Sequence, residues 1–463
     1  MKDKNKLSWY SVSLMAFASV WGFGNIINGF GKFGGVRVTP LWILVLVFYF
    51  VPYALMVGEL GSTFSNEEAG VSAWVKKLLN PRMAFYAGWM YFVVHLTYIP
   101  QRISNLIVAT SWTLFGKSIV NDINIVLLQA ITLLIFFIAV YISTKGMSIL
   151  GKLSSLAGIS MLILSILFVV LASFSFNVAP NETYYNASLS NYTDGYSIDF
   201  LMNLSLLIFA VGGCEKISPY INKMKQPNKG FPKAMIALAI MVGLTAIFGT
   251  RALGLLFDSN NIPSDLLMNG AYYAFDILDK NYQLGGLLVR AYALSFMITN
   301  AATIIISIDA PLRMLLSGSE KGYLPSWFYK QDKNGTYIGG LSIVCVVVSI
   351  FIVLPMFGIE NINQLINWLI KLNSICMPLR YLWVFIAYFF LKKSMSYSSN
   401  GFVFIKNKYF GMFVAIWCFI ITMLSCIMGM RSTNSFELTM NICSPIVLVG
   451  SGILISYLTK KDD

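Results

Sequence analysis

Charged side chains are scarce in this sequence. Only 11% of its 463 residues are Asp, Glu, Lys or Arg, against about 25% in a typical soluble domain. Hydrophobic residues make up 57% of the chain. A soluble protein of this composition would expose large apolar patches and aggregate. The composition therefore excludes an ordinary water-soluble globular protein and indicates a chain that is solvated by lipid.

The residues that most enzymes and metal sites depend on are also missing. The one histidine is His95, and the six cysteines form no CxxC pair. Metal ligation needs clustered thiolates, often with histidine, so we interpret the cysteines as free buried thiols. No Ser/His/Asp grouping and no GxxxxGK[ST] phosphate loop occurs. A single histidine also provides few groups for acid–base catalysis. We therefore expect no metal, no cofactor, no enzymatic activity and no ATP-driven pump in this chain.

Long apolar runs are what the sequence does contain. A transmembrane helix needs roughly 20 apolar residues, whereas a membrane barrel would show alternating segments of roughly ten residues. These runs do not alternate, so we predict an all-α membrane protein with about twelve transmembrane helices. The predicted spans are Leu7–Phe33, Pro40–Phe64, Met83–Phe115, Ile119–Ser143, Met147–Phe176, Asp199–Asn222, Ala234–Leu256, Leu287–Leu316, Ile338–Phe357, Ile362–Leu391, Tyr409–Met428 and Thr439–Leu458.

The basic residues stand in the short loops between these runs. Clusters such as Lys76–Lys77, Lys223–Lys233 and Lys392–Lys393 fall on the side that holds both termini. The other side has few, Arg37 and Lys117 among them. The positive-inside rule then places both termini in the cytoplasm. This pattern accounts for the net charge of +13 without a nucleic-acid partner, so we expect a multi-pass protein of the cell membrane, inner or plasma, with the lipid bilayer around it.

Two of the predicted spans are interrupted by glycine. The first contains Trp21-Gly22-Phe23-Gly24-Asn25 and the sixth contains Val211-Gly212-Gly213-Cys214-Glu215. Glycine lowers the cost of leaving helical geometry, and unwound backbone is tolerated in a membrane only where it lines a cavity or binds something. The breaks lie five spans apart, so helices one to five and six to ten would form two inverted halves. Interrupted helices at matching positions of such halves indicate a transporter substrate site; the alternative is that the glycines only allow close helix packing.

The two breaks predict complementary chemistry. A half-helix that begins after a break presents free N–H groups and the positive end of its dipole, which suits a carboxylate near Gly22, Phe23 and Gly24. A half-helix that ends at a break presents free carbonyls, here those of Phe209, Ala210 and Val211, which suit an ammonium group. Together they describe an amino-acid site, with Cys214 facing the substrate pathway. The candidate substrate-binding residues are Gly22, Phe23, Gly24, Asn25, Phe209, Ala210, Val211, Gly212, Gly213 and Cys214.

Ionisable residues inside the spans are candidates for a specific role, because a charge at mid-bilayer costs at least roughly 2.5 kcal/mol. Glu215 in the sixth break is a candidate proton carrier or gate, or else a cap on the freed backbone. His95 and Arg102, seven residues apart on one helix face, are candidates for contact with a carboxylate or a proton; a structural pairing of Arg102 is the alternative. Glu59, at the end of the second span, is expected to be structural.

Three stretches carry a resemblance to a known family. The first is Gly58-Glu59-Leu60-Gly61-Ser62, followed by Glu68-Ala69-Gly70 and Trp74-Val75; the second is Phe209–Glu215 with Met224, Pro227, Phe231 and Pro232 after it; the third runs from Gly318 to Pro325. They resemble the amino acid–polyamine–organocation superfamily over nearly the whole chain. The Gly22-Phe23-Gly24-Asn25 stretch and the Met224, Pro227, Pro232 spacing are most similar to the glutamate:γ-aminobutyrate antiporter group.

This resemblance implies a leucine-transporter-type 5+5 inverted repeat with two extra helices, and alternating access. It implies that Gly22–Gly24 hold the carboxylate, that Phe209 stacks over the substrate as a gate, and that Glu215 matches the family's sixth-helix glutamate. Two departures concern the site and the coupling ion. Phe23 replaces a residue that is small in the wider superfamily, and the fifth span lacks the mid-membrane lysine that stands in some relatives where sodium would bind.

The predicted function is secondary active transport of an amino acid, by exchange or by proton coupling, with glutamate, γ-aminobutyrate or a related amino acid as substrate. A transporter-like amino-acid sensor and a polyamine or organocation permease are the alternatives. We expect one polytopic domain over 1–463, with approximately inverted halves at 1–222 (helices one to six) and 223–391 (helices seven to ten) and two extra helices in 392–463. A homo-oligomer is compatible with this organisation.

Overall fold

The computed structural model of the protein describes residues 7–67, 70–144, 148–179, 190–193, 200, 202–318, 320, 322–332, 335–394 and 401–459, and most of these residues are helical. Glu68, Ala69, Ser319 and Lys321 of the family motifs lie outside these residues. The α-helices are α1 (Trp9–Val20), α2 (Phe23–Lys32), α3 (Val38–Val45), α4 (Val51–Thr63), α5 (Val71–Leu78), α6 (Pro81–Phe115), α7 (Ile125–Ser143), α8 (Ser148–Val178), α9 (Ser190–Thr193), α11 (Leu204–Val211), α12 (Pro227–Leu256), α13 (Leu266–Asn281), α14 (Leu287–Gly318), α15 (Ile338–Val353), α16 (Ile362–Cys376), α17 (Tyr381–Lys393), α18 (Lys408–Gly429) and α19 (Ser435–Thr459). The shorter helical segments are η2 (Gly35–Arg37), η3 (Leu46–Phe50), η4 (Val120–Asp122), η6 (Cys214–Lys223), η7 (Ser326–Tyr329), η8 (Leu354–Phe357) and η9 (Met377–Arg380).

Ten helical stretches of the described chain are long and apolar enough to cross a membrane. They coincide with ten of the predicted spans; Leu287–Leu316 and Ile338–Phe357 have the predicted bounds. The remaining two predicted runs are also helical. One is divided into α1 and α2, and the other is α6, which carries His95 and Arg102 among its apolar residues.

Both predicted interruptions are present. Helix α1 ends at Val20, and Gly22 has an extended backbone (φ −142°, ψ 156°) just before α2 begins. Helix α11 ends at Val211, and the chain turns at Gly213, whose φ of +107° lies in the left-handed region that favours glycine. The chain then continues as the 3₁₀ segment η6. Each broken helix therefore brings two helix ends to the interior of the bundle.

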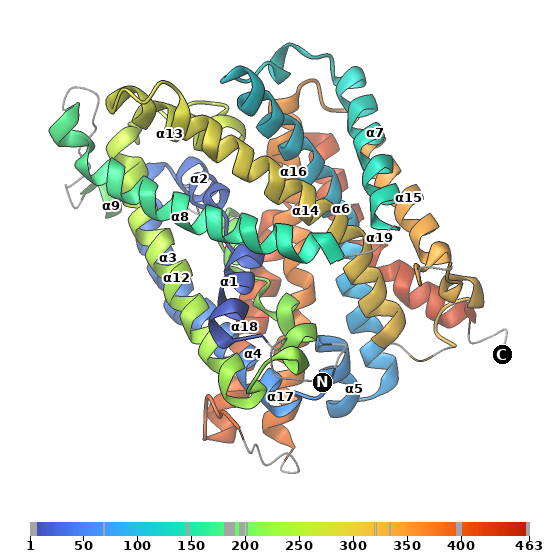
Figure 1. Cartoon of the computed structure of the whole chain (residues 1–463). Coiled ribbons are helices and arrows are strands. Elements are labelled where there is room, and N and C mark those ends of the chain that lie inside the picture. Colours follow the sequence, from blue (N-terminus) through green and yellow to red (C-terminus); the bar gives the residue numbers. More distant parts are fainter. Residues whose placement is uncertain are drawn as a thin grey trace.

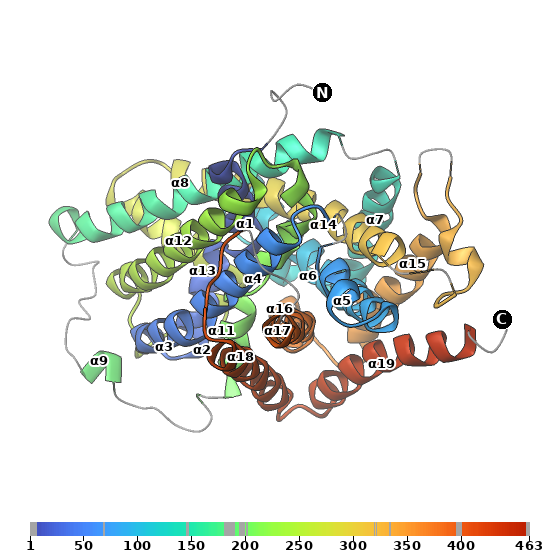
Figure 2. The ribbon, with the colours of Figure 1, turned by 90° about the horizontal axis from the view of Figure 1, so that it is seen from below.

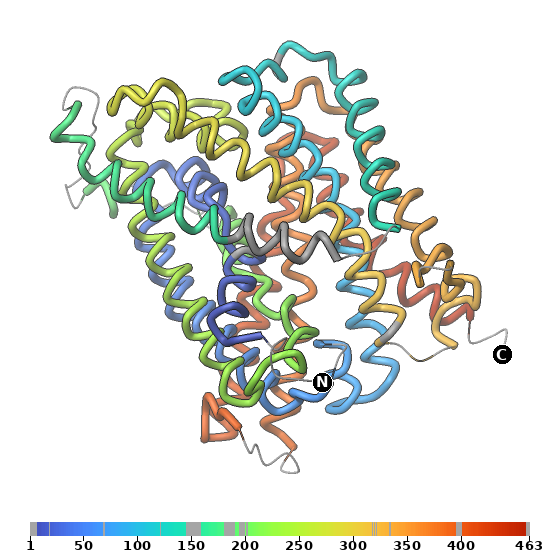
Figure 3. Tube along the Cα trace, viewed as in Figure 1, coloured from blue at the N-terminus to red at the C-terminus, as the bar shows by residue number. Residues whose placement is uncertain are grey.

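The helices pack around a long central pair formed by α6 and α14. Helix α13 lies at one end of the molecule and α5 at the other, as Figure 1 shows. The backbone trace in Figure 3 follows α8 across α1 and α12, both of which it contacts. Seen along the perpendicular direction in Figure 2, α18 and α19 lie along one edge of the bundle. The two C-terminal helices are therefore peripheral to the broken helices.

The outer surface of the bundle is apolar. Leu134 and Tyr141 on α7 are each 62% exposed, and Ile446 and Val447 on α19 are each 63% exposed. Large hydrophobic side chains in such number on the outside of a helix bundle mark a surface that contacts something other than water. Here the length of the helices fits the hydrocarbon layer of a bilayer.

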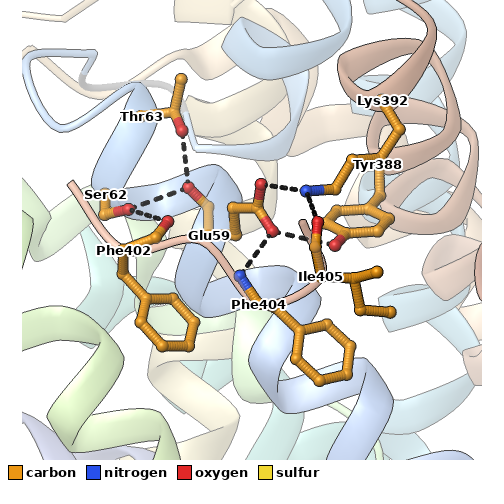
Figure 4. Close-up of polar contacts among 8 residues, drawn as sticks. All are labelled: Glu59, Ser62, Thr63, Tyr388, Lys392, Phe402, Phe404 and Ile405. Atoms are coloured by element: carbon orange, nitrogen blue, oxygen red, sulfur yellow. Dashed lines mark hydrogen bonds and ion pairs between the residues drawn. The ribbon is translucent and has the colours of Figure 1, made fainter. Parts of the chain in front are cut away.

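A buried carboxylate connects α4 with α17 and with the segment that precedes α18. Figure 4 shows Glu59 accepting hydrogen bonds from the Tyr388 hydroxyl (2.8 Å) and the Phe404 backbone N–H (2.9 Å), with the Lys392 ammonium 2.5 Å away. Lys392 also donates to the Ile405 carbonyl at 2.7 Å. Each oxygen of the carboxylate has a partner, so these contacts agree with the structural role expected of Glu59.

Candidate functional site

A cavity of about 630 Å³ lies between the two broken helices. It is lined by residues of α1, α2, α6, α8, α11, η6, α13, α14, α16, η9 and α17. Pockets of this size hold small-molecule ligands in many proteins. The cavity lining includes Tyr272 of α13 and Lys223 of η6.

The first break presents bare backbone to this cavity. Gly22 and Gly24 both line it, and a Cβ added to either would meet no atom within 4 Å. Gly22 is the N-cap residue of α2 and has no side chain to cap the helix. Because the first N–H groups of a helix have no intrahelical partner, the start of α2 provides donors and the positive end of a helix dipole at the cavity wall.

Phe23 is absent from the described lining of this cavity, although its neighbours Gly22 and Gly24 belong to it. The ring is 1% exposed and packs against Phe168 and Phe275, with centroid separations of 4.6 and 5.2 Å. Tyr292, whose ring centroid is 5.7 Å from that of Phe23, is itself part of the cavity lining. The bulky residue that departs from the family pattern is therefore accommodated behind the site.

The two breaks are joined by Asn25. Its side-chain amide donates to the Ala210 carbonyl at 3.1 Å and to the Val20 carbonyl at 3.4 Å. The Phe209 carbonyl accepts the backbone N–H of Gly212 at 3.3 Å. Two of the carbonyls that the sequence assigned to an ammonium group thus have protein donors in this structure.

Of the other residues predicted at the sixth break, Phe209 and Gly212 line the cavity, whereas Ala210, Val211, Gly213 and Cys214 are absent from its described lining. A Cβ on Gly212 would lie 2.1 Å from the Tyr381 ring, so only glycine fits there. Cys214 is 0% exposed, and its thiol contacts Tyr53 of α4. The expectation that Cys214 faces the pathway is corrected by this placement, because the turn at Gly213 sends the next side chain behind the wall.

Glu215 also lies behind the wall, in a buried ion pair. Its carboxylate is 3.1 Å from Nε of Arg380 and accepts a hydrogen bond from the Tyr53 hydroxyl. Arg380, 1% exposed, reaches the cavity and places a second guanidinium nitrogen 3.1 Å from Nε2 of His95. The Nδ1 of His95 is 2.6 Å from the Tyr91 carbonyl. The sequence-predicted Glu215 and His95 are therefore connected through Arg380, which sequence reasoning did not select as a site residue.

Arg102 and Lys216 meet at the ring of Tyr98. The Arg102 guanidinium carbon is 4.4 Å from the ring centroid, and Nζ of Lys216 is 5.4 Å from it. Arg102 also donates to the Tyr98 hydroxyl and, at 3.4 Å, to Oδ1 of Asn300. All three residues of this cluster line the cavity. Lys216 and Tyr98 were not predicted; the only sequence signal was a lysine next to Glu215 in a helix break.

The lining of the cavity is basic. It contains the cationic side chains of Arg102, Lys216, Lys223, Arg313 and Arg380, and no Asp or Glu side chain is among its described residues. A low-dielectric cavity lined by charge of one sign raises the local concentration of ligands of the opposite sign. The site is therefore electrostatically suited to an anion.

A family model described as amino acid permease matches residues 7–451. The chain belongs to this family, within the amino acid–polyamine–organocation superfamily, and is a multi-pass membrane transport protein.

Three of its relatives carry the names of transporters. The chain is 39% identical over 476 residues to the aspartate/glutamate permease AcaP of Lactococcus lactis subsp. cremoris (strain MG1363), covering 99% of this chain and 96% of that protein. It is 23% identical over 437 residues to the inner membrane transporter YjeM of Salmonella typhimurium (strain LT2), with coverage of 87% and 85%. It is 25% identical over 361 residues to the probable agmatine/putrescine antiporter AguD of Lactococcus lactis subsp. lactis (strain IL1403), with coverage of 76% and 72%.

Proposed function

We propose that this protein is a secondary active transporter of acidic amino acids in the cytoplasmic membrane. The observation that carries the proposal is the cavity between the two broken helices, with its five basic side chains and no acidic side chain among the described lining residues. Aspartate and glutamate each carry two carboxylates and one ammonium group. Their net charge of about −1 near neutral pH complements that lining.

The substrate's backbone groups would bind at the helix breaks. The start of α2 offers N–H donors to the α-carboxylate beside Gly22 and Gly24. The ammonium group would bind the sixth-break carbonyls and replace the Asn25 amide at the Ala210 carbonyl, while Phe209 covers the bound substrate. Carboxylate and ammonium subsites on two discontinuous helices are the arrangement that inverted-repeat transporters use.

The proposal includes an architecture of twelve spans. The pair α1 and α2 would form one further span and α6 would form another, so that the ten long apolar stretches become twelve spans. The first repeat would run from α1 to α8 and the second from α11 to α17, with α18 and α19 as the extra pair. By the positive-inside rule, the distribution of basic residues among the loops supports a cytoplasmic location for both termini. Transport would proceed by alternating access, through exchange of substrates or proton coupling, with Glu215 as the candidate proton-linked group.

The charge of the cavity lining also favours acidic substrates over polyamines. A relative named as an aspartate/glutamate permease supports an acidic substrate. A relative named as an agmatine/putrescine antiporter would suggest a polyamine, but a dication needs carboxylates, and the described lining offers none. Glutamate exchanged for γ-aminobutyrate remains within the proposal, because both carry a carboxylate and an ammonium group.

The test is uptake by proteoliposomes that contain the full-length protein. Vesicles preloaded with glutamate, aspartate, γ-aminobutyrate, lysine or putrescine are compared, with and without a pH gradient. We expect labelled aspartate or glutamate to enter fastest into vesicles that hold an acidic amino acid or a favourable pH gradient. Uptake of putrescine or lysine in preference to both acidic amino acids would overturn the proposal.

A further inference from the structure

Two cations without an ionic partner converge on one tyrosine in the cavity. Among the described residues no carboxylate lies within 4.0 Å of Arg102 or Lys216. The nearest acidic neighbour in sequence, Glu215, is already paired with Arg380 and bonded to Tyr53. We propose that Arg102 and Lys216, at the ring of Tyr98, bind the side-chain carboxylate of the substrate and so determine selectivity for acidic amino acids. This inference rests on the proposed transport function.

The other basic residues of the cavity are less suited to this role. Arg380 is paired with Glu215 at 3.1 Å, and Arg313 is paired with Asp309 at 2.5 Å in the described chain. Lys223 is the last residue of η6 and lies over the Tyr220 ring at 5.3 Å, away from Tyr98. The Arg102–Lys216 pair is therefore the place where two basic side chains of the described cavity lining meet and neither has a carboxylate within 4.0 Å.

The donors of Arg102 are only partly used. Its two terminal nitrogens donate to the Tyr98 hydroxyl and to Oδ1 of Asn300, the latter at the long distance of 3.4 Å. Its Nε is buried and has no hydrogen-bond partner within the described structure. A guanidinium has five N–H donors and an ammonium has three. A carboxylate between Arg102 and Lys216 would receive charge-assisted hydrogen bonds from both and remove the cost of two like charges held together in a membrane.

The subsite would also fix the orientation of the substrate. The α-carboxylate is assigned to the start of α2, on one broken helix, whereas Lys216 follows the break of the other. Arg102 comes from the unbroken helix α6. A substrate with one carboxylate can satisfy either end but not both. A neutral amide in place of the side-chain carboxylate would leave the two cations without a counter-charge. The protein would therefore bind the amide more weakly than the acid.

The experiment compares aspartate with asparagine, which differ only in the distal group. Inhibition of labelled-substrate uptake in proteoliposomes gives the apparent affinity of each, and their ratio is the readout. We expect Lys216→Met and Arg102→Met each to lower the aspartate-to-asparagine preference by roughly 10- to 100-fold, the loss of one charge-assisted hydrogen bond. Lys216→Arg keeps the charge and should keep most of the preference.

The matched control is Lys280→Met on α13, an exposed lysine that pairs with Asp276 at 2.7 Å outside the cavity. It should leave the ratio unchanged. A variant without uptake is tested instead by the shift in thermal unfolding temperature that each amino acid produces in detergent. An equal loss of affinity for aspartate and asparagine in both Met variants would overturn the subsite while leaving acidic-amino-acid transport intact. A wild-type protein that takes up neither acidic amino acid would overturn the proposed function itself.

Discussion

The side-chain amide of Asn25 donates to the backbone carbonyl of Ala210 across 3.1 Å and so joins the two broken helices. The two residues are 185 positions apart in the chain. The amide nitrogen takes the place at this carbonyl that the proposed function gives to the substrate's ammonium group. Asn25 therefore satisfies a carbonyl that the break after α11 would otherwise leave without a donor.

Asn25→Ala removes this connection. We expect the ligand-free protein to lose about 1 kcal/mol of stability, the usual net value of one hydrogen bond. Saturating substrate should restore part of the loss, because its ammonium group then binds the Ala210 carbonyl. The measurement is thermal unfolding in detergent with and without aspartate. An equal loss in both conditions would mean that Asn25 keeps its bond to Ala210 when substrate binds.

Gly24→Val tests the carboxylate subsite. A Cβ at this position meets no atom within 4 Å, so the new side chain should fit the fold and fill the space in front of α2. We expect uptake to be lost while the unfolding temperature stays near that of the wild type.

The contrasting variant for Gly24→Val is Gly212→Ala. Its methyl group would lie 2.1 Å from the Tyr381 ring, and overpacking of this kind costs about 1–3 kcal/mol. It should therefore lower stability. Normal substrate affinity in the Gly24→Val variant would show that the α-carboxylate of the substrate does not bind at the start of α2.

Glu215→Gln separates a proton-linked role from a structural one. The change leaves Arg380, 1% exposed, without its ionic partner, and breaking a buried pair costs about 3–5 kcal/mol. We expect a clear fall in unfolding temperature. If Glu215 also exchanges a proton during the cycle, the surviving uptake should vary less with pH than uptake by the wild-type protein.

Tyr53→Phe is the control for this variant. It removes one hydrogen bond to the Glu215 carboxylate but leaves the charge in place. The expected cost is about 1 kcal/mol, with the dependence on pH retained. A Glu215→Gln protein whose uptake follows the wild-type pH profile would exclude the proton role and leave Glu215 as the partner of Arg380.

Glu59→Gln tests the connection between α4, α17 and the segment before α18. Gln has no negative charge to pair with the Lys392 ammonium, which lies 2.5 Å from Oε1 of Glu59 in a buried setting. We expect a loss of roughly 3–5 kcal/mol, by the same argument as for other buried pairs. Glu360→Gln, at an exposed position, is the matched control and should change the unfolding temperature little. Equal stability of the two variants would show that the Lys392 contact contributes nothing measurable.

Much of the fold followed from the sequence, because hydrophobic length and glycine position are local properties. The interruptions at Gly22 and Gly213 were predicted from glycine alone, and ten spans agree with the apolar runs. His95 and Arg102, placed on one face by their spacing, both line the cavity.

The site was less predictable, because its side chains come from helices whose relative rotation is set by packing. The positive φ of Gly213 directs Cys214 towards α4, and the aromatic cluster draws the Phe23 ring away from the cavity. The meeting of Lys216 with Tyr98 depends on how η6 docks against α6. No periodicity along the chain contains that information.

The contact between Gly212 and Tyr381 has a consequence for sequence variation in the family. The ring occupies the volume that any side chain at position 212 would need. A change to alanine there is tolerable only where position 381 carries a smaller residue. We therefore expect the two positions to co-vary among relatives, with a bulky ring at one recurring together with glycine at the other, although 168 residues separate them from one another in the chain.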